Sequence, residues 1–350
     1  MMAIALERRL TVEAVAPSAP ESTFAVEVRR GLTAQPKQLP CRFFYDHQGS
    51  RIFEQICDLP EYYLTRAEQE ILTRHADEIA AAMPVATMLV ELGSGSAAKT
   101  RRLIEAFLRR QEALRYVPID IARGMLEASA RQLLADYPAL VIHAVAAEYR
   151  DGLRRLQHLR HTAEADRPRL VLWLGSNVGN FERDEAAAFL AQVRTTLGPD
   201  DRLLVGVDLR KDRAVLEPAY DDAQGVTACF NKNLLDRINR ELGGHFDLEA
   251  FDHRAIYAED AGRIEMYLVS RRAQTAPIDG LELRVPFAAG EAIHTENSYK
   301  YSLDEIRALA AAAGLVVERQ WLDGDRRFSE CLFRPAGASP AGTSTWGGGE

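Results

Sequence analysis

Short apolar runs alternate with segments of helical periodicity through the middle of the chain. Runs typical of β-strands recur at 87–92, 115–120, 139–146, 169–175 and 201–209. Segments with apolar residues spaced as on one face of a helix lie between them, at 99–110, 122–136, 149–159 and 183–196. Parallel strands need crossover connections, which are right-handed. The pattern therefore predicts a doubly wound α/β fold, with helices on both faces of a parallel sheet.

The alternation ends after Asp208. Residues 214–241 predict a helix, whose apolar stripe comprises Phe230, Leu234, Leu235, Ile238 and Leu242. Runs that predict antiparallel strands follow at 254–259, 263–271 and 281–287. Two final runs, which predict a hairpin across Asp323-Gly324-Asp325, lie at 315–322 and 327–334.

Two capping-box motifs predict further helix starts, because a Ser or Thr and a Glu three residues later cap each other's backbone N–H groups. Thr65-Arg-Ala-Glu68 predicts a helix to about Ala82. Ser302-Leu-Asp-Glu305 predicts a helix that ends at Gly314. Five strands, an excursion, and then helix, strand and strand match a seven-stranded methyltransferase sheet with a reversed last pair.

This order predicts two domains and two tails. Residues 211–300 are expected to be inserted between strands five and six, and to form an α+β substrate-binding domain with residues 22–65. The cofactor-binding domain, with the Rossmann-like sheet, is expected to comprise residues 66–210 and 301–335. Both chain ends are rich in small residues and predict disordered tails, at 1–21 and 336–350.

The first strand leads into a glycine turn with an acid before it, Glu91-Leu-Gly93-Ser-Gly95. A strand, a glycine turn and a helix start build a cleft at the carboxyl end of a parallel sheet. Glycine lets the backbone come close to a ligand. The carboxylate of Glu91 would repel a pyrophosphate and favour a cation, such as the ammonium and sulfonium of S-adenosylmethionine.

A dinucleotide remains an alternative, because Gly93, Gly95 and Ala98 also fit the G-x-G-x-x-G/A fingerprint. Asp120 ends the next apolar run, and an acid roughly 20 residues after the turn is expected to bind ribose hydroxyls in either cofactor. Asp120 can equally cap a helix. The residues thus leave an NAD(P)-dependent oxidoreductase and a plain turn open, while Glu91 favours the methyl donor.

Composition excludes several other classes. The formal net charge of −8 argues against a nucleic-acid partner, whose binders carry basic patches. The four cysteines form no C-x-x-C pair, and the eight histidines show no ligand spacing, so we predict reduced thiols and no metal. There is neither a signal-peptide core nor an apolar run of the ~20 residues that span a membrane. We expect a cytoplasmic monomer without a membrane partner.

Polar side chains in three segments suit an amino-acid ligand. Asn180, in a glycine-containing loop after the fourth strand, offers a donor and an acceptor, although it also fits a left-handed turn. Tyr220 could donate to a carboxylate or simply pack. Strand alternation would turn Glu296 and Ser298 to one side. The alternative there is a polar loop in which Lys300 pairs with Glu296 in solvent.

The order of motifs from Tyr45 to Tyr301 strongly resembles the L-histidine Nα-methyltransferases of ergothioneine biosynthesis. The blocks are F-Y-D, L-P-E-Y-Y-x-T-R, E-L-G-S-G-S-x-x-K-T, L-G-S-x-x-G-N, A-Y-D-D, R-I-E-M and H-T-E-x-S-x-K-Y. The match spans roughly residues 22–335. The glycine block is generic, whereas A-Y-D-D, R-I-E-M and E-x-S-x-K are specific to the family.

The resemblance implies three methylations of the α-amino nitrogen of L-histidine by S-adenosylmethionine, giving hercynine. It implies that Asn180 and Tyr220 hold the α-carboxylate and amino group. Tyr62, with Tyr45, would line the amine side, and these two tyrosines are the catalytic candidates.

The other substrate contacts also follow from the resemblance. Glu296 and Ser298 would hydrogen-bond the imidazole, and Met266 would wall its pocket. A member of the same family acting on another amino acid or amine stays open, because Glu296 could meet a different donor. A non-enzymatic scaffold is the remaining alternative.

On the donor side the resemblance matches Gly93, Lys99 and Asp120 to cofactor contacts, beside Glu91 and Gly95 from the residue argument. Glu148 and Tyr149 fall where the family places an acid and an aromatic ring against adenine. Two positions depart from the family pattern. Many members have Thr or Ser in place of Asn177 and Asp in place of Glu148, which affects the loop and the adenine edge.

Overall fold

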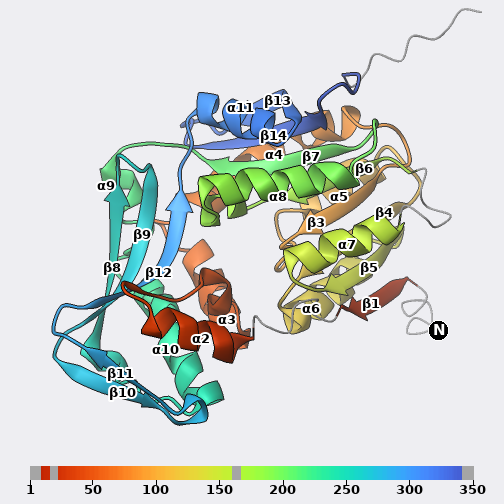
Figure 1. The fold of residues 1–350 in the computed structure, drawn as a ribbon. Helices are drawn as coiled ribbons and strands as arrows, with labels where there is room; N and C mark the ends of the chain where they lie inside the picture. Colours follow the sequence, from red (N-terminus) through yellow and green to blue (C-terminus); the bar gives the residue numbers. More distant parts are fainter. Residues whose placement is uncertain (1–8, 16–22, 160–166, 341–350) are drawn as a thin grey trace, which may run out of the picture.

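The computed structural model describes residues 9–15, 23–159 and 167–340 (Figure 1). Within these residues, one eight-stranded sheet has the strand order β1-β5-β4-β3-β6-β7-β14-β13. Its strands are β1 (Leu10–Ala14), β3 (Met88–Leu92), β4 (Leu114–Asp120), β5 (Leu140–Ala146), β6 (Arg169–Trp173), β7 (Arg202–Asp208), β13 (Leu315–Leu322) and β14 (Phe328–Pro335). β14 runs antiparallel to both of its neighbours, and the other pairs are parallel. The predicted doubly wound α/β class with a reversed last pair is confirmed.

Helices cover both faces of this sheet. They are α4 (Tyr63–Ala81), α5 (Arg101–Leu108) and α6 (Arg123–Asp136) on one face, and α7 (Tyr149–Leu159), α8 (Arg183–Thr196) and α11 (Leu303–Ala312) on the other. Successive strand residues point to opposite faces, so Leu89 packs with α4 and α5 while Val90 joins the α7–α8 side. Both faces of each central strand are therefore buried, which explains the continuous apolar runs.

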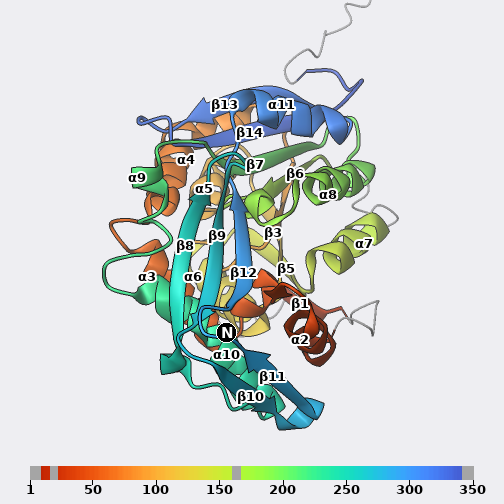
Figure 2. The ribbon, with the colours of Figure 1, turned by 60° about the vertical axis from the view of Figure 1, so that its left-hand side comes forward.

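The chain between β7 and β13 forms a second layer. It comprises α9 (Arg213–Leu216), α10 (Val226–Leu242), η4 (Leu248–Ala250), β8 (Phe251–Ala258), β9 (Arg263–Ser270), β10 (Gln274–Ile278), η5 (Asp279–Leu281), β11 (Leu283–Phe287) and β12 (Ala292–Tyr299). A sheet of order β2-β12-β9-β8 stands beside the main sheet, with α10 packed against it (Figures 1 and 2). β10 and β11 form a separate hairpin.

The N-terminal segment joins this second layer. Its elements are α2 (Phe24–Thr33), β2 (Lys37–Gln38), η2 (Cys41–Phe44) and α3 (His47–Cys57). β2 pairs in parallel with β12, with Lys37 opposite Ile293, and α3 packs against α10. Residues far apart in the sequence therefore meet where the second layer faces the main sheet.

Both predicted tails need correction where the structure describes them. Leu10–Ala14 is not disordered but pairs in parallel with β5 as the edge strand β1. The Arg9 guanidinium holds this strand by donating to backbone oxygens at the end of α6, including that of Tyr137 at 3.1 Å. At the other end, Arg202 donates to the Ser339 oxygen at 2.8 Å. The remaining tail residues lie outside the described ones.

Two helix predictions were also inexact. α4 begins at Tyr63, and its N-cap Tyr62 makes no side-chain capping bond, so Thr65 caps nothing and Glu68 lies inside the helix. The predicted helix 214–241 is interrupted between α9 and α10, where Gly225 takes a φ of 73°. The Ser302 capping box is confirmed, with both reciprocal bonds present.

None of the helices in residues 9–15, 23–159 and 167–340 has the length and apolar character needed to cross a membrane.

Candidate active site

A pocket opens beside the carboxyl end of β6, between the main sheet and the second layer. Its empty space, which includes solvent at the open mouth, is about 510 Å³. The residues predicted to bind substrate all line it: Tyr45, Tyr62, Asn180, Tyr220, Met266, Glu296 and Ser298. Phe53, Thr227 and Phe230 line it as well, and sequence reasoning missed them.

The lining residues come from several elements that are far apart in the sequence. Tyr45 follows η2, Tyr62 precedes α4, and Asn180 ends the 3₁₀ helix η3 (Asn177–Asn180), directly after β6. Tyr220 lies in the connection between α9 and α10. The polar segment 294–300, for which a solvent loop was the alternative, is largely strand β12.

The pairing of β12 with β9 sets the polar wall. Glu296 lies opposite Met266, and a register shift between His294 and Glu296 precedes this pair. Glu296 and Ser298, two residues apart, both face the pocket as alternation predicts. Met266 is only 1% exposed and contributes the apolar side of the same wall.

Glu296 has no hydrogen-bond partner in the described part of the chain. Burial raises the pKa of its carboxyl group to about 7, and the nearby Lys300 ammonium limits that rise. Enclosing a carboxylate without donors is costly. The geometry therefore suits a ligand that brings an N–H donor to this oxygen pair.

Lys300 does not pair with Glu296 in solvent. It is fully buried, with its Nζ atom 2.8 Å from the Asp208 Oδ2 atom. The same ammonium donates to the Tyr220 hydroxyl at 2.7 Å and to the Ser298 hydroxyl at 2.9 Å. The two hydroxyl oxygens lie 2.9 Å apart. The positions of Tyr220 and Ser298 in the pocket thus depend on the buried ion pair between Lys300 and Asp208.

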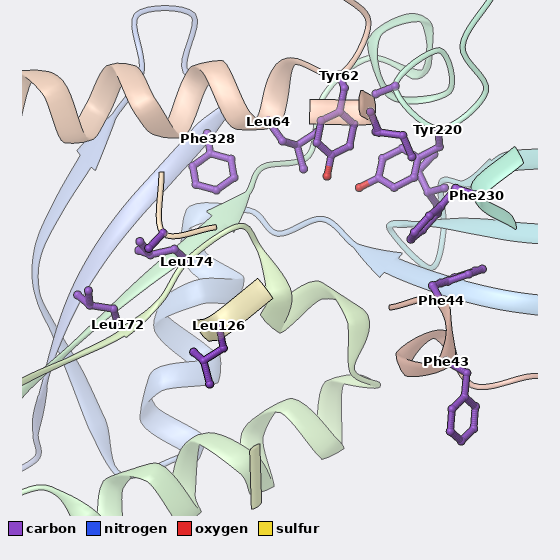
Figure 3. Packing of buried hydrophobic residues seen from close by; sticks show 14 of the residues in the cluster. Phe43, Phe44, Tyr62, Leu64, Leu126, Leu172, Leu174, Tyr220, Phe230 and Phe328 are labelled. Atoms are coloured by element: carbon purple, nitrogen blue, oxygen red, sulfur yellow. The ribbon is translucent and has the colours of Figure 1, made fainter. Parts of the chain in front are cut away.

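Aromatic rings form another part of the pocket lining. Figure 3 shows Tyr62 and Tyr220 next to each other, with Phe230 beyond Tyr220. The ring centroids of Tyr62 and Tyr220 are 6.2 Å apart, and those of Tyr45 and Phe230 are 5.7 Å apart. No described group hydrogen-bonds to the Tyr62 hydroxyl. Burial, with a smaller effect of neighbouring groups, raises the pKa of Tyr45 and Tyr62 well above the ordinary value, so both phenols stay protonated at neutral pH.

The glycine turn lies at the carboxyl ends of β3 and β4. Gly93 has a φ of 72°, and a Cβ atom there would lie 2.5 Å from the Tyr149 hydroxyl oxygen. The Asp120 carboxylate accepts from the Gly95 and Ala122 backbone N–H groups, each at 2.8 Å. Asp120 therefore holds the turn, whereas the N-cap of α6 is Ala122 and has no side-chain capping bond. The half-buried Asp120 carboxylate keeps further acceptor capacity for a ligand.

The expected role of Glu91 needs correction. Its side chain is almost wholly buried, and its carboxylate accepts hydrogen bonds from Thr100, at 2.8 Å, and from Tyr116. Burial raises the pKa of this group to about 7. Glu91 thus joins β3 to β4 and to the start of α5, rather than presenting a free charge to a cationic ligand. The sequence showed the acid but not its neighbours.

Lys99 links the glycine turn to the pocket through a residue that sequence reasoning misplaced. Lys99 forms an ion pair with Glu68, and the other oxygen of Glu68 accepts from the Gly175 N–H at 2.5 Å. Gly175 lines the pocket. The capping-box interpretation hid this role. The spacing of Glu68 from Leu64, Ile71 and Leu72 already placed it on the apolar face of the helix.

The proposed adenine contacts differ from one another. Tyr149 packs its ring near Trp173, with centroids 6.1 Å apart, and its hydroxyl lies over Gly93. The Glu148 side chain is 42% exposed, and its Oε1 atom lies 3.8 Å from the Nε atom of Arg42. The Asn177 side chain donates to the Leu174 oxygen at 2.7 Å, which supports the loop after β6. These donor-side residues lie outside the pocket lining, except Asn177.

Among the described residues, no group of His, Cys, Asp and Glu side chains could hold a metal ion.

Comparisons with known proteins show which family the chain belongs to. The family model described as histidine-specific methyltransferase, S-adenosylmethionine-dependent, matches residues 24–335. The chain is 46% identical to the Histidine N-alpha-methyltransferase of Mycolicibacterium smegmatis, over 85% of this chain and 90% of that protein. The protein of the same name from Mycobacterium tuberculosis is 43% identical, over 85% and 90% of the two chains. Ergothioneine biosynthesis protein 1 of Neurospora crassa is 35% identical over 83% of this chain and 32% of that protein.

The match covers the main sheet apart from β1, the sheet β2-β12-β9-β8, the glycine turn and every residue that lines the pocket. This chain belongs to the family of histidine-specific, S-adenosylmethionine-dependent methyltransferases.

Proposed function

We propose that this protein transfers methyl groups from S-adenosylmethionine to the α-amino nitrogen of L-histidine, three times in succession, to give hercynine. One observation carries the proposal. The Glu296 carboxylate lacks a hydrogen-bond partner in the described residues and lines the same pocket as Asn180. A ligand with an N–H group at one end and an amino-acid head group at the other fits this pair, and L-histidine has both.

The residues at the glycine turn fit the methyl donor. A Cβ atom on Gly95 would meet nothing within 4 Å, so the backbone there borders open space, and Asp120 holds the turn while keeping lone pairs for ribose hydroxyls. Lys99, Glu148 and Tyr149 are the other residues that would hold the nucleoside and its amino-acid tail. When bound, S-adenosylmethionine supplies an electrophilic methyl group on a sulfonium.

The chain contributes mainly orientation. Asn180 and Tyr220 would bind the α-carboxylate and amino group, and Glu296 and Ser298 would bind the imidazole. Fixing both ends of the substrate converts methyl transfer into a reaction between positioned groups. An α-ammonium has no lone pair, so it must lose a proton first, and the free Tyr62 hydroxyl could pass this proton to water.

The aromatic wall supports repeated methylation. Each added methyl group removes an N–H donor from the amine, and the final product is a quaternary cation. The rings of Tyr45, Phe53, Tyr62 and Phe230 offer aromatic faces, which attract such cations without hydrogen bonds.

A family member that acts on another amine is the second candidate, because the free Glu296 carboxylate could accept from other donors. The family match removes the NAD(P)-dependent oxidoreductase from consideration. To decide the substrate, the purified protein is incubated with labelled S-adenosylmethionine and each amino acid singly, and products are identified by mass spectrometry. We expect mono-, di- and trimethylated histidine only. Faster methylation of another amine would overturn the proposal. The monomeric state and cytoplasmic location stay predictions.

A further inference from the structure

Lys300, the last residue of the E-x-S-x-K block, does not line the pocket. It contacts Tyr220 and Ser298, which both do. Its ammonium is fully buried at the end of β12 and has three N–H donors. Asp208 takes one, the Tyr220 hydroxyl oxygen takes the second and the Ser298 hydroxyl oxygen takes the third. All of its donors are therefore used within the protein.

The hydrogen count of this trio determines what the pocket offers a ligand. An isolated Tyr or Ser hydroxyl can donate or accept. Here both oxygens already accept from Lys300, and they are also 2.9 Å apart, so one hydroxyl donates to the other. Of the two hydroxyl hydrogens, one therefore has no acceptor among these three side chains. Because an ammonium cannot accept a hydrogen bond, that hydrogen can be used only by a ligand or water in the pocket.

The position of Lys300 is held by groups on the main sheet. Asp208 ends β7, and its carboxylate also accepts from Tyr63, at 2.8 and 2.9 Å, and from Lys211 at 2.5 Å. The Asp208 backbone N–H donates to Ser176, which lines the pocket, at 2.9 Å. Two cations share one buried anion, so the cluster keeps a positive charge behind the two hydroxyls.

We propose that Lys300 is a positioning residue: held by Asp208, it turns the Tyr220–Ser298 pair into a hydrogen-bond donor toward an acceptor atom of the substrate, and it stabilises negative charge at that atom. The acceptor is a carboxylate oxygen or an unprotonated ring nitrogen. This inference rests on the proposed function, since it takes L-histidine as the ligand. The competing explanation is that Lys300 only neutralises Asp208 within the fold.

The two explanations differ in what happens when both charges are removed. Lys300→Met alone leaves Asp208 with one cation fewer, and it can destabilise the fold. Asp208→Asn combined with Lys300→Met removes both charges of this pair, and the amide oxygen at position 208 can still accept from Tyr63 and Lys211. The fold should therefore recover while the donors to Tyr220 and Ser298 stay absent. Lys232→Met, on α10 and outside the pocket lining, is the matched control.

The test uses the full chain and two calorimetric titrations. In the first, L-histidine is titrated in the presence of saturating S-adenosylhomocysteine. In the second, S-adenosylhomocysteine is titrated alone. For the double variant we expect a histidine Kd raised about tenfold or more, as for a lost bond to a charged group, and an S-adenosylhomocysteine Kd within about twofold of the wild type. KM for histidine should rise more than kcat falls. Thermal unfolding checks folding.

A double variant that binds L-histidine as tightly as the wild type would show that Lys300 only neutralises Asp208. Equal weakening of both ligands would also overturn the inference, because it would indicate a general effect on the fold. If the wild-type protein itself does not bind L-histidine, the proposed function fails rather than this inference.

Discussion

The Tyr220 and Ser298 hydroxyl oxygens lie 2.9 Å apart, although 78 residues separate them in the chain. Tyr220 belongs to the connection before α10, and Ser298 to β12. The proposed function assigns Tyr220 to the amino-acid head group and Ser298 to the imidazole. The two ends of the substrate site are thus joined by a hydrogen bond, and each residue supports the position of the other.

Substitutions at these two positions should not be additive. Tyr220→Phe removes one hydroxyl and leaves Ser298 with Lys300 as its remaining partner, so Ser298→Ala should cost less in the Tyr220→Phe background than in the wild type. We expect a coupling energy of about 0.5–3 kcal/mol, as for residues in one network. Histidine Kd values from the four proteins of a double-mutant cycle measure it. Strict additivity would mean that the two hydroxyls act independently.

Replacing Glu296 should weaken histidine selection and spare the cofactor. Sites built around a buried hydrogen bond can reject analogues by ~10⁴ or more, because the unpaired group is costly. We therefore expect Glu296→Ala to lose most of its preference for L-histidine over other amino acids, with S-adenosylmethionine affinity within a few-fold. Calorimetric titration of both ligands tests this. Glu259→Ala, at a side chain 76% exposed, is the control. Equal loss of both ligands would indicate a folding role for Glu296.

Tyr62→Phe should slow turnover modestly and keep the pH optimum within about one unit. The pKa of Tyr62 is raised well above its ordinary value, mainly by burial, so the phenol stays protonated and is not a strong general base. The measurement is the pH profile of kcat, with Tyr137→Phe, at a tyrosine outside the pocket lining, as the control. An abolished rate would instead make Tyr62 an essential acid–base group.

Glu330→Gln should stabilise the protein more at pH 8 than at pH 5. Glu330 is fully buried on β14 beside Glu68, and a Cβ atom on Gly206 would meet both carboxyl groups, at 3.1 and 2.3 Å. Burial and the neighbouring Glu68 raise the pKa of Glu330 well above 4.5. The folded state therefore holds a proton that the unfolded state releases, and stability falls as pH rises from about 4.5 toward the folded pKa.

The amide in Glu330→Gln has the same shape and does not titrate. The difference in Tm between variant and wild type should thus grow with pH, by about 1–2 °C for each kcal/mol, because the unfolding entropy increases with chain length. Thermal unfolding at pH 5 and pH 8 measures it. Parallel pH dependences of the two proteins would mean that Glu330 titrates normally in the folded state.

Local patterns in the sequence predicted most of the main sheet. Strands buried on both faces leave continuous apolar runs, helices leave a period of 3.6, and a glycine turn after a strand marks the ligand edge, all within a few residues of one another. The order of short motifs was enough to indicate the family and its substrate residues. The family resemblance did not depend on hydrophobic periodicity, because it rests on short motifs that occur in a fixed order along the chain.

What a side chain touches was decided only by tertiary structure. Glu91 was visible as an acid at a strand end, but its partners Thr100 and Tyr116 arrive from α5 and β4. Lys300 was visible as a cation near Glu296, but Asp208 at the end of β7 is the anion that it pairs with.

Leu10–Ala14 gave no local sign of order either, because a parallel edge strand depends on a partner far away in the chain, here β5. A sequence therefore determines which elements form and which chemical groups they carry. The long-range pairing of strands determines which groups are buried together, and burial beside a specific partner sets their charge and their role.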